Sequence, residues 1–395
     1  VEDLTVSDNI FVLRRGFKKH IINKNMLNTQ LKRVLDEMDI RIDGNALVSE
    51  LKAYEKCLVE LVKAYIGGVK LIIIKDISNY ISVTDLAKFF KLLRYFCSKG
   101  ISFIYVCNHH EEAFKICDRI SLMENGRILK IFESDEFSDE NMKPYIVDLY
   151  DSGDIVKKNM KESEGVLRFS NVFTSSLQGM SFSVEKGECA VLLDINNTVL
   201  KELIKIMNRE LIPYCGEIYL NGKNFFDGRN SKELRKEVGF INEQPAKSMV
   251  FPEMNYIDNL CFLIDQKNKF RKYNKRIRKS ITQEYAPLTG EDIYVDDVKS
   301  LPAYSLYNLI YYRFHLFNPK VVFCVQPFYG ADMYLRKHII KLINKLKQKG
   351  IAVVILAVNL EDSLVVADRL IIVENGKFRT EYDRSAFHHI TPSYV

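Results

Sequence analysis

The stretches LIIIKDISNY (71–80) and VVFCVQPFYG (321–330) share one plan. Each begins with at least four apolar residues in a row, which is the pattern of a strand buried on both faces of a parallel sheet. Each then becomes polar at a turn, where many α/β enzymes place a metal-binding carboxylate. Lys75 and Asp76 follow the first strand, whereas Gln326 follows the second. The two stretches therefore predict the fold class and leave open whether the chemistry of such a site is present.

An internal repeat links these stretches. CDRISLMENGRI (117–128) matches ADRLIIVENGKF (367–378), so that Asp118 corresponds to Asp368 at a shift of 250 positions. A constant shift over roughly 120 residues predicts that one fold unit occurs twice in the chain. Residues 165–250 have no counterpart in the first copy. The chain is therefore expected to begin inside the first copy, as an N-terminally truncated form.

The shared part of each copy alternates strands and helices. A polar helical stretch leads to a buried strand, an amphipathic helix, a second β-branched strand, another helix and a hairpin with Asn-Gly at its turn. This order requires a parallel sheet with right-handed crossovers. In the second copy, VEKGE (184–188) precedes the strand CAVLL and a helix from about Val199, which is where a phosphate-binding loop would lie. The polar segment 151–164 is predicted to be a linker between residues 1–150 and 165–395.

Composition places the chain among globular proteins. It has 395 residues, 47% hydrophobic content and a net charge of +6, which is enough for two or three domains with cores of their own. No apolar run is long enough to cross a membrane, and the first residues lack the features of a signal peptide. The eight cysteines include no Cys-x-x-Cys pair, which argues against zinc and fits a reducing compartment. A cytoplasmic location is therefore expected.

A resemblance to a known family rests on VEKGE, GEIYLNGK (216–223), INEQ (241–244), NPKVVF (318–323) and the two Asp-Arg…Asn-Gly hairpins, which occur in this order. The chain resembles the fused tandem ATP-binding cassette (ABC) ATPase subunits of ribose- and galactose-type carbohydrate importers over nearly its whole length. The resemblance implies α/β cassettes of the P-loop NTPase (RecA-like) type in tandem, each with a helical subdomain. Residues 1–150 would be the C-terminal part of the first cassette. Residues 165–395 would be the second cassette, which adds an antiparallel β subdomain.

The resemblance also implies partners and a location. Members of the family bind ATP with Mg²⁺ and dock on the transmembrane subunits of a permease, as peripheral proteins on the cytoplasmic face of the cell membrane. Glu243 and Gln244 match the loop that senses nucleotide and touches the permease. These two residues are therefore the expected permease contact, and Gln244 is also a candidate nucleotide ligand.

The glycine-rich phosphate loop of the family is altered here. In the family, its backbone N–H groups surround the β- and γ-phosphates and its hydroxyl binds magnesium. The gapless match is DINNTVLKE (194–202), with Asp194 at the first glycine and Lys201 at the hydroxyl position. Asn197 tolerates a left-handed backbone, but Asp194 would repel a phosphate. Asp194, Asn197 and Lys201 are therefore candidate ligands of ATP, and the alternative is an ordinary strand-to-helix loop that binds no phosphate.

The strand ends carry a second alteration. Members of the family have Asp-Glu there, where the aspartate holds magnesium through water and the glutamate polarises the attacking water. The first copy has Lys75 and Asp76, and the second has Val325 and Gln326. Asp76 is one methylene shorter than glutamate, and Gln326 cannot accept a proton. A magnesium site is therefore not expected, and neither strand end keeps an intact catalytic residue.

Two further motifs of the family are altered as well. The signature loop presents small residues to the γ-phosphate across the dimer, but LKAYEK (51–56) and LPAYSL (301–306) place Tyr54 and Tyr304 where glycine lets backbone approach phosphate. The switch histidine that contacts the γ-phosphate is matched by Asn108. Changes at every nucleotide-facing motif predict a pseudo-ATPase.

A basic run, KNKFRKYNKRIRK (267–279), lies in the helical subdomain of the second copy. It is either a solvated helix face or a patch for an anionic membrane surface, and nucleic acid ranks last because the run has little aromatic interleaving. The expected function is a degenerate ATP-binding subunit of a carbohydrate importer. The alternatives are a scaffold or regulatory protein derived from an ABC ATPase, and a weakly active ATPase that relies on the absent N-terminal segment.

Overall fold

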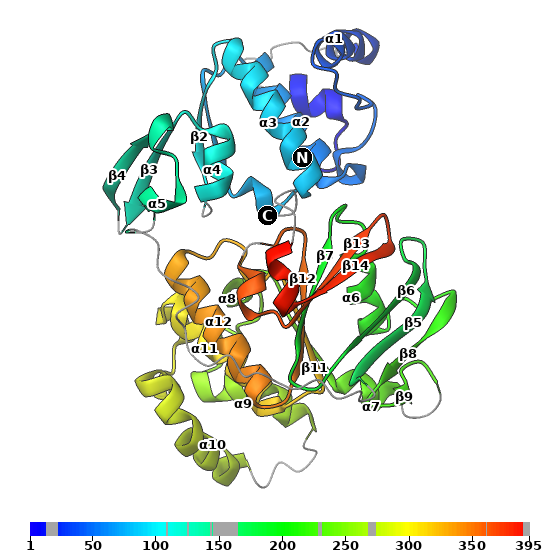
Figure 1. Cartoon of the computed structure of the whole chain (residues 1–395), viewed down its shortest axis with the longest axis vertical. Helices are drawn as coiled ribbons and strands as arrows, with labels where there is room; N and C mark the ends of the chain where they lie inside the picture. The colour runs from blue at the N-terminus through cyan, green and yellow to red at the C-terminus, as the bar shows by residue number, and fades with distance from the viewer. Residues whose placement is uncertain are drawn as a thin grey trace. The chain divides into compact units, whose positions relative to one another are not determined.

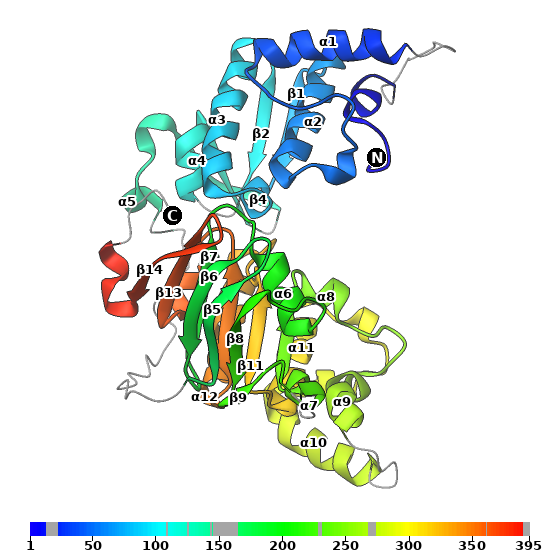
Figure 2. The ribbon, with the colours of Figure 1, turned by 90° about the vertical axis from the view of Figure 1, so that its right-hand side faces the viewer.

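The computed structural model describes residues 1–12, 23–107, 110–124, 126–142, 144, 165–227, 231–267, 274–360 and 362–389. The chain divides into two compact units, Val1–Pro144 and Tyr145–Val395, whose elements are labelled in Figures 1 and 2. The predicted linker, residues 151–164, lies outside the described residues.

The first unit combines helices with two small sheets. Its strands are β1 (Leu71–Lys75), β2 (Ser102–Val106), β3 (Arg119–Glu124) and β4 (Arg127–Glu133), and its helices are α1 (Lys24–Glu37), α2 (Ala53–Ile66), α3 (Val83–Ser98), α4 (His110–Ile116) and α5 (Asp139–Met142). β1 and β2 pair in parallel, and β3 and β4 form an antiparallel hairpin. The side chain of Ser82 caps α3 by accepting a hydrogen bond from the N–H of Asp85. Phe89, Leu93 and Phe96 on this helix then enter the core of the unit.

The second unit is built around a six-stranded sheet. Its strands are β5 (Leu167–Phe173), β6 (Gln178–Val184), β7 (Cys189–Asp194), β8 (Cys215–Leu220), β9 (Lys223–Asn224), β10 (Val238–Ile241), β11 (Val321–Val325), β12 (Ala352–Ala357), β13 (Arg369–Glu374) and β14 (Lys377–Asp383). Its helices are α6 (Leu200–Asn208), α7 (Ser231–Lys236), α8 (Pro245–Ser248), α9 (Tyr256–Lys267), α10 (Asn274–Thr289), α11 (Ala303–Phe317), α12 (Met333–Gln348) and α13 (Ser363–Val366). The sheet order is β10-β11-β12-β7-β13-β14, parallel except for β14 at the edge. A separate antiparallel sheet has the order β6-β5-β8-β9.

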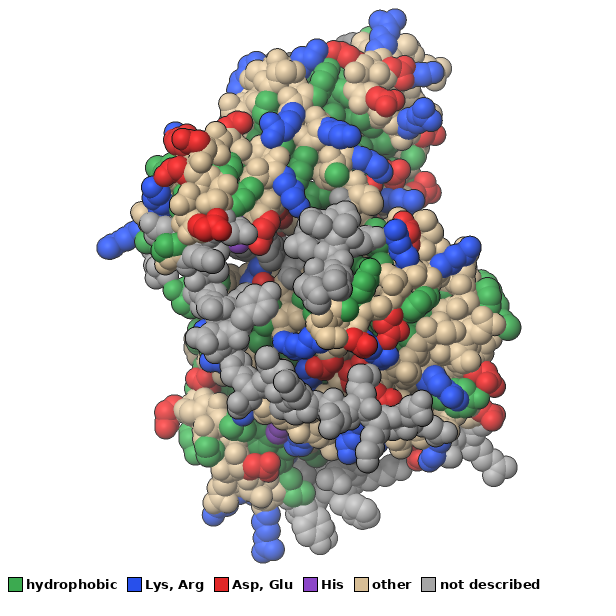
Figure 3. Space-filling view, viewed as in Figure 1, with side chains coloured by type: hydrophobic (Ala, Val, Ile, Leu, Met, Phe, Trp, Pro, Cys, Tyr) green, Lys and Arg blue, Asp and Glu red, His purple; other side chains and the backbone are tan. Residues whose placement is uncertain are grey.

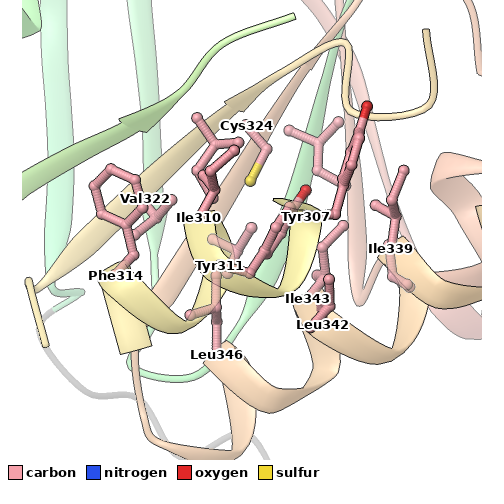
Figure 4. Packing of buried hydrophobic residues seen from close by; sticks show 14 of the residues in the cluster. Tyr307, Ile310, Tyr311, Phe314, Val322, Cys324, Ile339, Leu342, Ile343 and Leu346 are labelled. Atoms are coloured by element: carbon pink, nitrogen blue, oxygen red, sulfur yellow. The ribbon is translucent and has the colours of Figure 1, made fainter. Parts of the chain in front are cut away.

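Two apolar clusters fill the two faces of the six-stranded sheet. α6 and the antiparallel sheet cover one face, and α9, α11 and α12 cover the other (Figure 1). Figure 4 shows side chains of the cluster between the sheet and helices α9, α11 and α12. Among them are Tyr311 and Phe314 of α11, Val322 of β11 and Ile343 of α12. Each fully buried side chain of this size contributes about 1.5–3 kcal/mol to the free energy of unfolding. These faces give the α/β core, helical part and antiparallel β part that the sequence predicts for the second copy.

The predicted repeat is present in the strand pairing. Leu71 lies opposite Ser102 in the first unit, and Val321 lies opposite Ala352 in the second, each 250 positions further along the chain. The two hairpins also share a register shift, after Leu122 in β3 and after Ile372 in β13. The same local pattern of apolar residues and turns therefore produces the same pairing twice.

The two copies differ in how their strands are covered. In the second unit β7 lies between β12 and β13, and Phe323 of β11 is only 1% exposed. In the described residues of the first unit, β1–β2 and β3–β4 form separate two-stranded sheets. Ile73, the counterpart of Phe323, is 65% exposed as a result, and Ile104 of β2 is 47% exposed. One face of the first unit is therefore apolar and open.

Candidate functional site

The loop between β7 and α6 is the segment for which the sequence predicts a counterpart of a phosphate loop. All six residues of β7 are buried, and the loop that follows turns at Asn197, whose φ is +52°. Leu203 and Ile206 anchor α6 against the sheet because they lie on its buried face. The predicted strand, loop and helix are thus in place, and Asn197 adopts the left-handed conformation expected of it.

Asp194 turns its carboxylate back into this loop. The side chain is fully buried, and its Oδ2 accepts a hydrogen bond of 2.6 Å from the N–H of Val199. Burial raises the pKa of the Asp194 carboxyl, and the peptide N–H groups of Val199, Leu200, Thr198 and Asn196, in that order, oppose the rise. From the sequence, Asp194 is expected to be a charge that faces an incoming phosphate. In the structure it instead occupies the interior of the loop, because the free N–H groups at the start of a helix attract an anion.

Lys201 and Glu202 follow at the start of α6. Lys201 is exposed, and its charge opposes the rise in pKa that burial causes at the Glu243 carboxyl. The Glu202 carboxylate accepts hydrogen bonds from the hydroxyls of Thr174 and Ser175 and one of 3.0 Å from the N–H of Ser176. Glu202 therefore ties α6 to the turn between β5 and β6, which sequence spacing did not indicate.

Gln326 and Glu243 meet at the ends of β11 and β10. Nε2 of Gln326 donates a hydrogen bond of 2.8 Å to Oε1 of Glu243. Partial burial raises the pKa of the Glu243 carboxyl, while the Gln326 bond and the charge of Lys201 oppose that rise. The preceding residue, Val325, is 8% exposed and belongs to the apolar cluster under α6. This strand end therefore offers an amide and an apolar side chain where the resemblance predicts two carboxylates.

Gln244 lies beside the loop that follows β11. Its φ is +44°, and it directly precedes α8. A Cβ added at Gly330, whose φ is +66°, would lie 3.2 Å from Nε2 of Gln244. Gly330 therefore allows the Gln244 side chain to approach the backbone closely. The structure brings Glu243, Gln244 and Gln326 together at one edge of the sheet.

The corresponding strand end of the first unit has its own polar cluster. Asp76 has a φ of +50°, close to the +41° of Gln326 at the equivalent position. Nζ of Lys75 lies 3.9 Å from the buried Asp76 carboxylate, but the Lys75 side chain is 74% exposed, so this pair is weak. Tyr105 donates a hydrogen bond to Glu112, whose carboxyl pKa is raised mainly by burial and also by the charge of Asp76. Sequence reasoning missed this cluster.

Asn108, the predicted counterpart of the switch histidine, lies outside the described residues.

The signature position of the second unit is filled by an aromatic stack. Tyr304 stands in the first turn of α11 and stacks on His338 of α12 with ring centroids 3.5 Å apart. Nε2 of His338 lies 2.8 Å from Oδ1 of Asn308, and burial lowers the pKa of His338 to about 4. Pro302, which caps α11, has no N–H to offer a phosphate. The bulk predicted at this position is therefore present and held in place.

A groove of ≈ 560 Å³ lies between α6, β10 and the end of α11. It is lined by residues that include Ile204, Arg235, Phe240, Phe314 and Phe317. Gly239 on β10 is required there, because an added Cβ would lie 2.8 Å from the ring of Phe314. Aromatic side chains and the basic residues Arg235 and Lys236 line the groove together, and so does Asn242, which directly precedes Glu243.

Surface charge is mixed over the described residues. Figure 3 shows acidic and basic side chains interspersed on the face that it presents. In the predicted basic run, Arg278 forms ion pairs of 2.7 Å with Asp258 and with Asp265, while residues 268–273 lie outside the described residues. Within the described ranges, no helix is long and apolar enough to cross a membrane, and no cluster of three or more His, Cys, Asp or Glu is arranged to hold a metal ion.

Comparison with known proteins identifies relatives and the fold. No protein-family model matches the chain. The ribose import ATP-binding protein RbsA of Clostridium perfringens (strain SM101 / Type A) is 26% identical over 394 residues, which cover 97% of this chain and 78% of the relative. The galactose/methyl galactoside import ATP-binding protein MglA of Yersinia pestis bv. Antiqua (strain Antiqua) is 21% identical over 380 residues, covering 94% and 75% of the two chains.

A solved structure agrees with these relatives. The structure of cbiO1 from Clostridium perfringens, part of the ABC transporter complex cbiONQ, superposes with a TM-score of 0.50 and 18% identity over 57% of this chain and 92% of that one. The predicted fold class is thereby confirmed. The chain has the P-loop NTPase-like fold of ABC ATPases, and its relatives are the ATP-binding proteins of ribose and galactose importers.

Proposed function

We propose that this chain is a non-hydrolysing ATP-binding-cassette subunit of a carbohydrate importer, docked on permease subunits at the cytoplasmic face of the membrane. The names of its relatives support the importer role. The observation that carries the loss of hydrolysis is the end of β11, where Val325 is packed in the core and Gln326 is bound to Glu243.

Phosphoryl transfer from a magnesium nucleotide needs one carboxylate that holds the metal and a second group that orients the attacking water. Val325 has no polar atom for the first role, and the Gln326 amide cannot accept a proton for the second. The loop at Asp194 adds a further obstacle, because its interior already holds a carboxylate. The residues present therefore do not fit Mg²⁺ with ATP, and no hydrolytic step is assigned to them.

The groove between α6, β10 and α11 is the proposed docking site for the permease. Phe240 and Phe317 are partly exposed and supply apolar area, and the exposed Lys236 supplies positive charge. A short amphipathic helix in a cytoplasmic loop of a permease would bury its apolar side on these rings. Glu243 and Gln244 lie at the end of β10 beside the groove, in the place proposed for contact with the permease.

Two measurements test the proposal. The full chain is produced together with ribose- or galactose-type permease subunits, captured from detergent-solubilised membranes, and assayed for phosphate release with Mg²⁺ and ATP. We expect the permease to co-purify and phosphate release to stay at background. Phe317→Asp in the groove should abolish capture, whereas the control Phe173→Asp, at a side chain 37% exposed on β5, should not. Phosphate release that chelation of magnesium abolishes would overturn the loss of hydrolysis.

A weakly active ATPase is the second candidate. The Glu243 carboxylate favours it, because it lies 2.8 Å from Gln326 and could orient a water in place of the missing glutamate. In that case Glu243→Gln should remove a measurable phosphate release. A regulatory protein outside transport would instead be indicated by failure to capture any permease.

A further inference from the structure

The loop between β7 and α6 has the backbone of an anion-binding nest. Its turn at Asn197 is left-handed, with a φ of +52°, and Val199 then has the helical values −105° and −23° before the nine-residue helix α6 begins. Successive N–H groups in such a turn converge on one point, and the first N–H groups of a helix have no partner within the helix. This geometry attracts negative charge whichever group supplies it.

The Asp194 carboxylate fills that point. The side chain has no exposed surface, although it carries an ionisable group. Oδ2 receives the N–H of Val199, while the buried Oδ1 has no hydrogen-bond partner among the described residues. A buried carboxylate with one oxygen unsatisfied is costly. The N–H of Val199 offsets part of this cost, and burial still leaves the pKa of the Asp194 carboxyl above its usual range.

The structure assigns to Asp194 the role of an internal ligand that occupies the anion position of this loop, so that removing its carboxylate turns the loop into a binding site for an external oxyanion of the phosphate class. This inference deepens the proposed function, because it names the group that keeps phosphate out. It does not depend on which partner the chain docks on.

Contacts outside the nest hold the loop in shape. The N–H of Ile195 donates to the carbonyl of Val373 at 3.1 Å, and the N–H of Asn375 donates to Oδ1 of Asn196 at 2.8 Å. These bonds join the loop to β13 and to the turn after it, so the nest should keep its backbone when Asp194 is replaced. Asn197 and Thr198 are exposed, which places the nest next to solvent, and the exposed Lys201 adds positive charge close by.

A purely structural role is the competing explanation. Asp194 could act only as a distant N-terminal cap of α6, in the way that other carboxylates stabilise helix starts. Replacing it would then lower stability without creating affinity for any anion. The two explanations differ in whether an external oxyanion restores the lost stability.

The test uses the full chain and two probes, inorganic phosphate and pyrophosphate, at constant ionic strength set with chloride. The variants are Asp194→Gly and Asp194→Asn, and the control is Asp227→Gly, which removes an exposed carboxylate from the same unit. We expect the melting temperature of Asp194→Gly to rise by about 2–4 °C with phosphate at about five times its Kd. The unmodified chain and Asp227→Gly should not respond. Binding is then measured directly by calorimetry or by ³¹P line broadening.

Each outcome decides the inference. A folded Asp194→Gly chain that ignores both probes would overturn it, and so would a phosphate response of the unmodified chain equal to that of the variant. If Asp194→Gly does not fold, Asp194→Asn decides, because its neutral amide should yield to phosphate with a smaller shift, and no shift would refute the inference. The proposed function fails on a different readout, which is magnesium-dependent phosphate release by the unmodified chain.

Discussion

The hydrogen bond between Gln326 and Glu243 allows a sharp test, because it joins the catalytic-glutamate position to the loop proposed to contact the permease. Replacing Gln326 by glutamate introduces the residue type that the resemblance to ABC ATPases implies at this position. It also replaces the N–H···O bond of 2.8 Å by two carboxylates that face one another. We expect this change to lower stability in a pH-dependent way without creating ATPase activity.

The size of the effect follows from the exposure of the pair. Two unit charges about 4 Å apart repel by about 2 kcal/mol at an effective dielectric constant of about 40. Glu243 is exposed, and solvent screening therefore reduces the expected loss to about 1–2 kcal/mol. The repulsion raises the pKa of both carboxyls in the folded state above their unfolded values. The loss should therefore be absent below about pH 4 and fully present at neutral pH and above.

Urea unfolding of Gln326→Glu at pH 4 and pH 8 measures this difference. The matched control is the double variant Glu243→Gln with Gln326→Glu, which reverses donor and acceptor but keeps the hydrogen bond, and it should return to within about 0.5 kcal/mol of the unmodified chain. A single variant as stable at pH 8 as the unmodified chain would refute the contact. Phosphate release by Gln326→Glu that chelation abolishes would refute the reasoning on function, since the strand end still lacks a metal carboxylate.

Three further predictions concern stability and the repeat. Phe323→Asp should lower the free energy of unfolding by more than about 3 kcal/mol, because it buries an unpaired charge. The equivalent change in the first unit, Ile73→Asp, should cost less than about 1 kcal/mol, because the Ile73 side chain is 65% exposed. Urea unfolding monitored in each unit would distinguish the two. Burial lowers the pKa of His338 to about 4, below its unfolded value, so the chain should lose stability as pH falls from about 6.5 towards 4. His338→Gln should remove about 1 kcal/mol of that loss. An unchanged dependence of stability on pH would contradict this prediction. Gly239→Ala should lower the stability of the chain by about 1–3 kcal/mol, because the new Cβ would lie 2.8 Å from the ring of Phe314. A melting temperature equal to or above that of the unmodified chain would instead show that the ring moves aside.

Local sequence patterns were enough to predict the elements of this chain and their repetition. Apolar runs such as 71–74 and 321–324 form strands in both units, and the shift of 250 positions reappears in the pairing of β1–β2 and β11–β12. The Asn-Gly turn at Asn375 and Gly376 has positive φ at both residues, as its hairpin requires. These features depend on residues close together in the chain, so their signal is present in any short window.

The contacts at the candidate site could not be predicted from the sequence and became visible only in the tertiary structure. β10 and β11 pair with Ile241 opposite Cys324. Glu243 lies two positions after Ile241, and Gln326 lies two positions after Cys324. Glu243 and Gln326 therefore meet although 83 positions separate them. Sequence spacing could not reveal this, because the order of strands in the sheet decides which strand ends are neighbours.

The sequence by itself determined that Asp194 and Val325 stand where the resemblance to ABC ATPases predicts the first glycine of a phosphate loop and a metal-binding carboxylate. It did not determine which way the Asp194 side chain points. The tertiary structure decided that, because Asp194 is buried at the end of β7 and its carboxylate accepts a hydrogen bond from the N–H of Val199 at the start of α6. A residue type can be read from the chain, but the group that a side chain reaches depends on which elements the fold places around it.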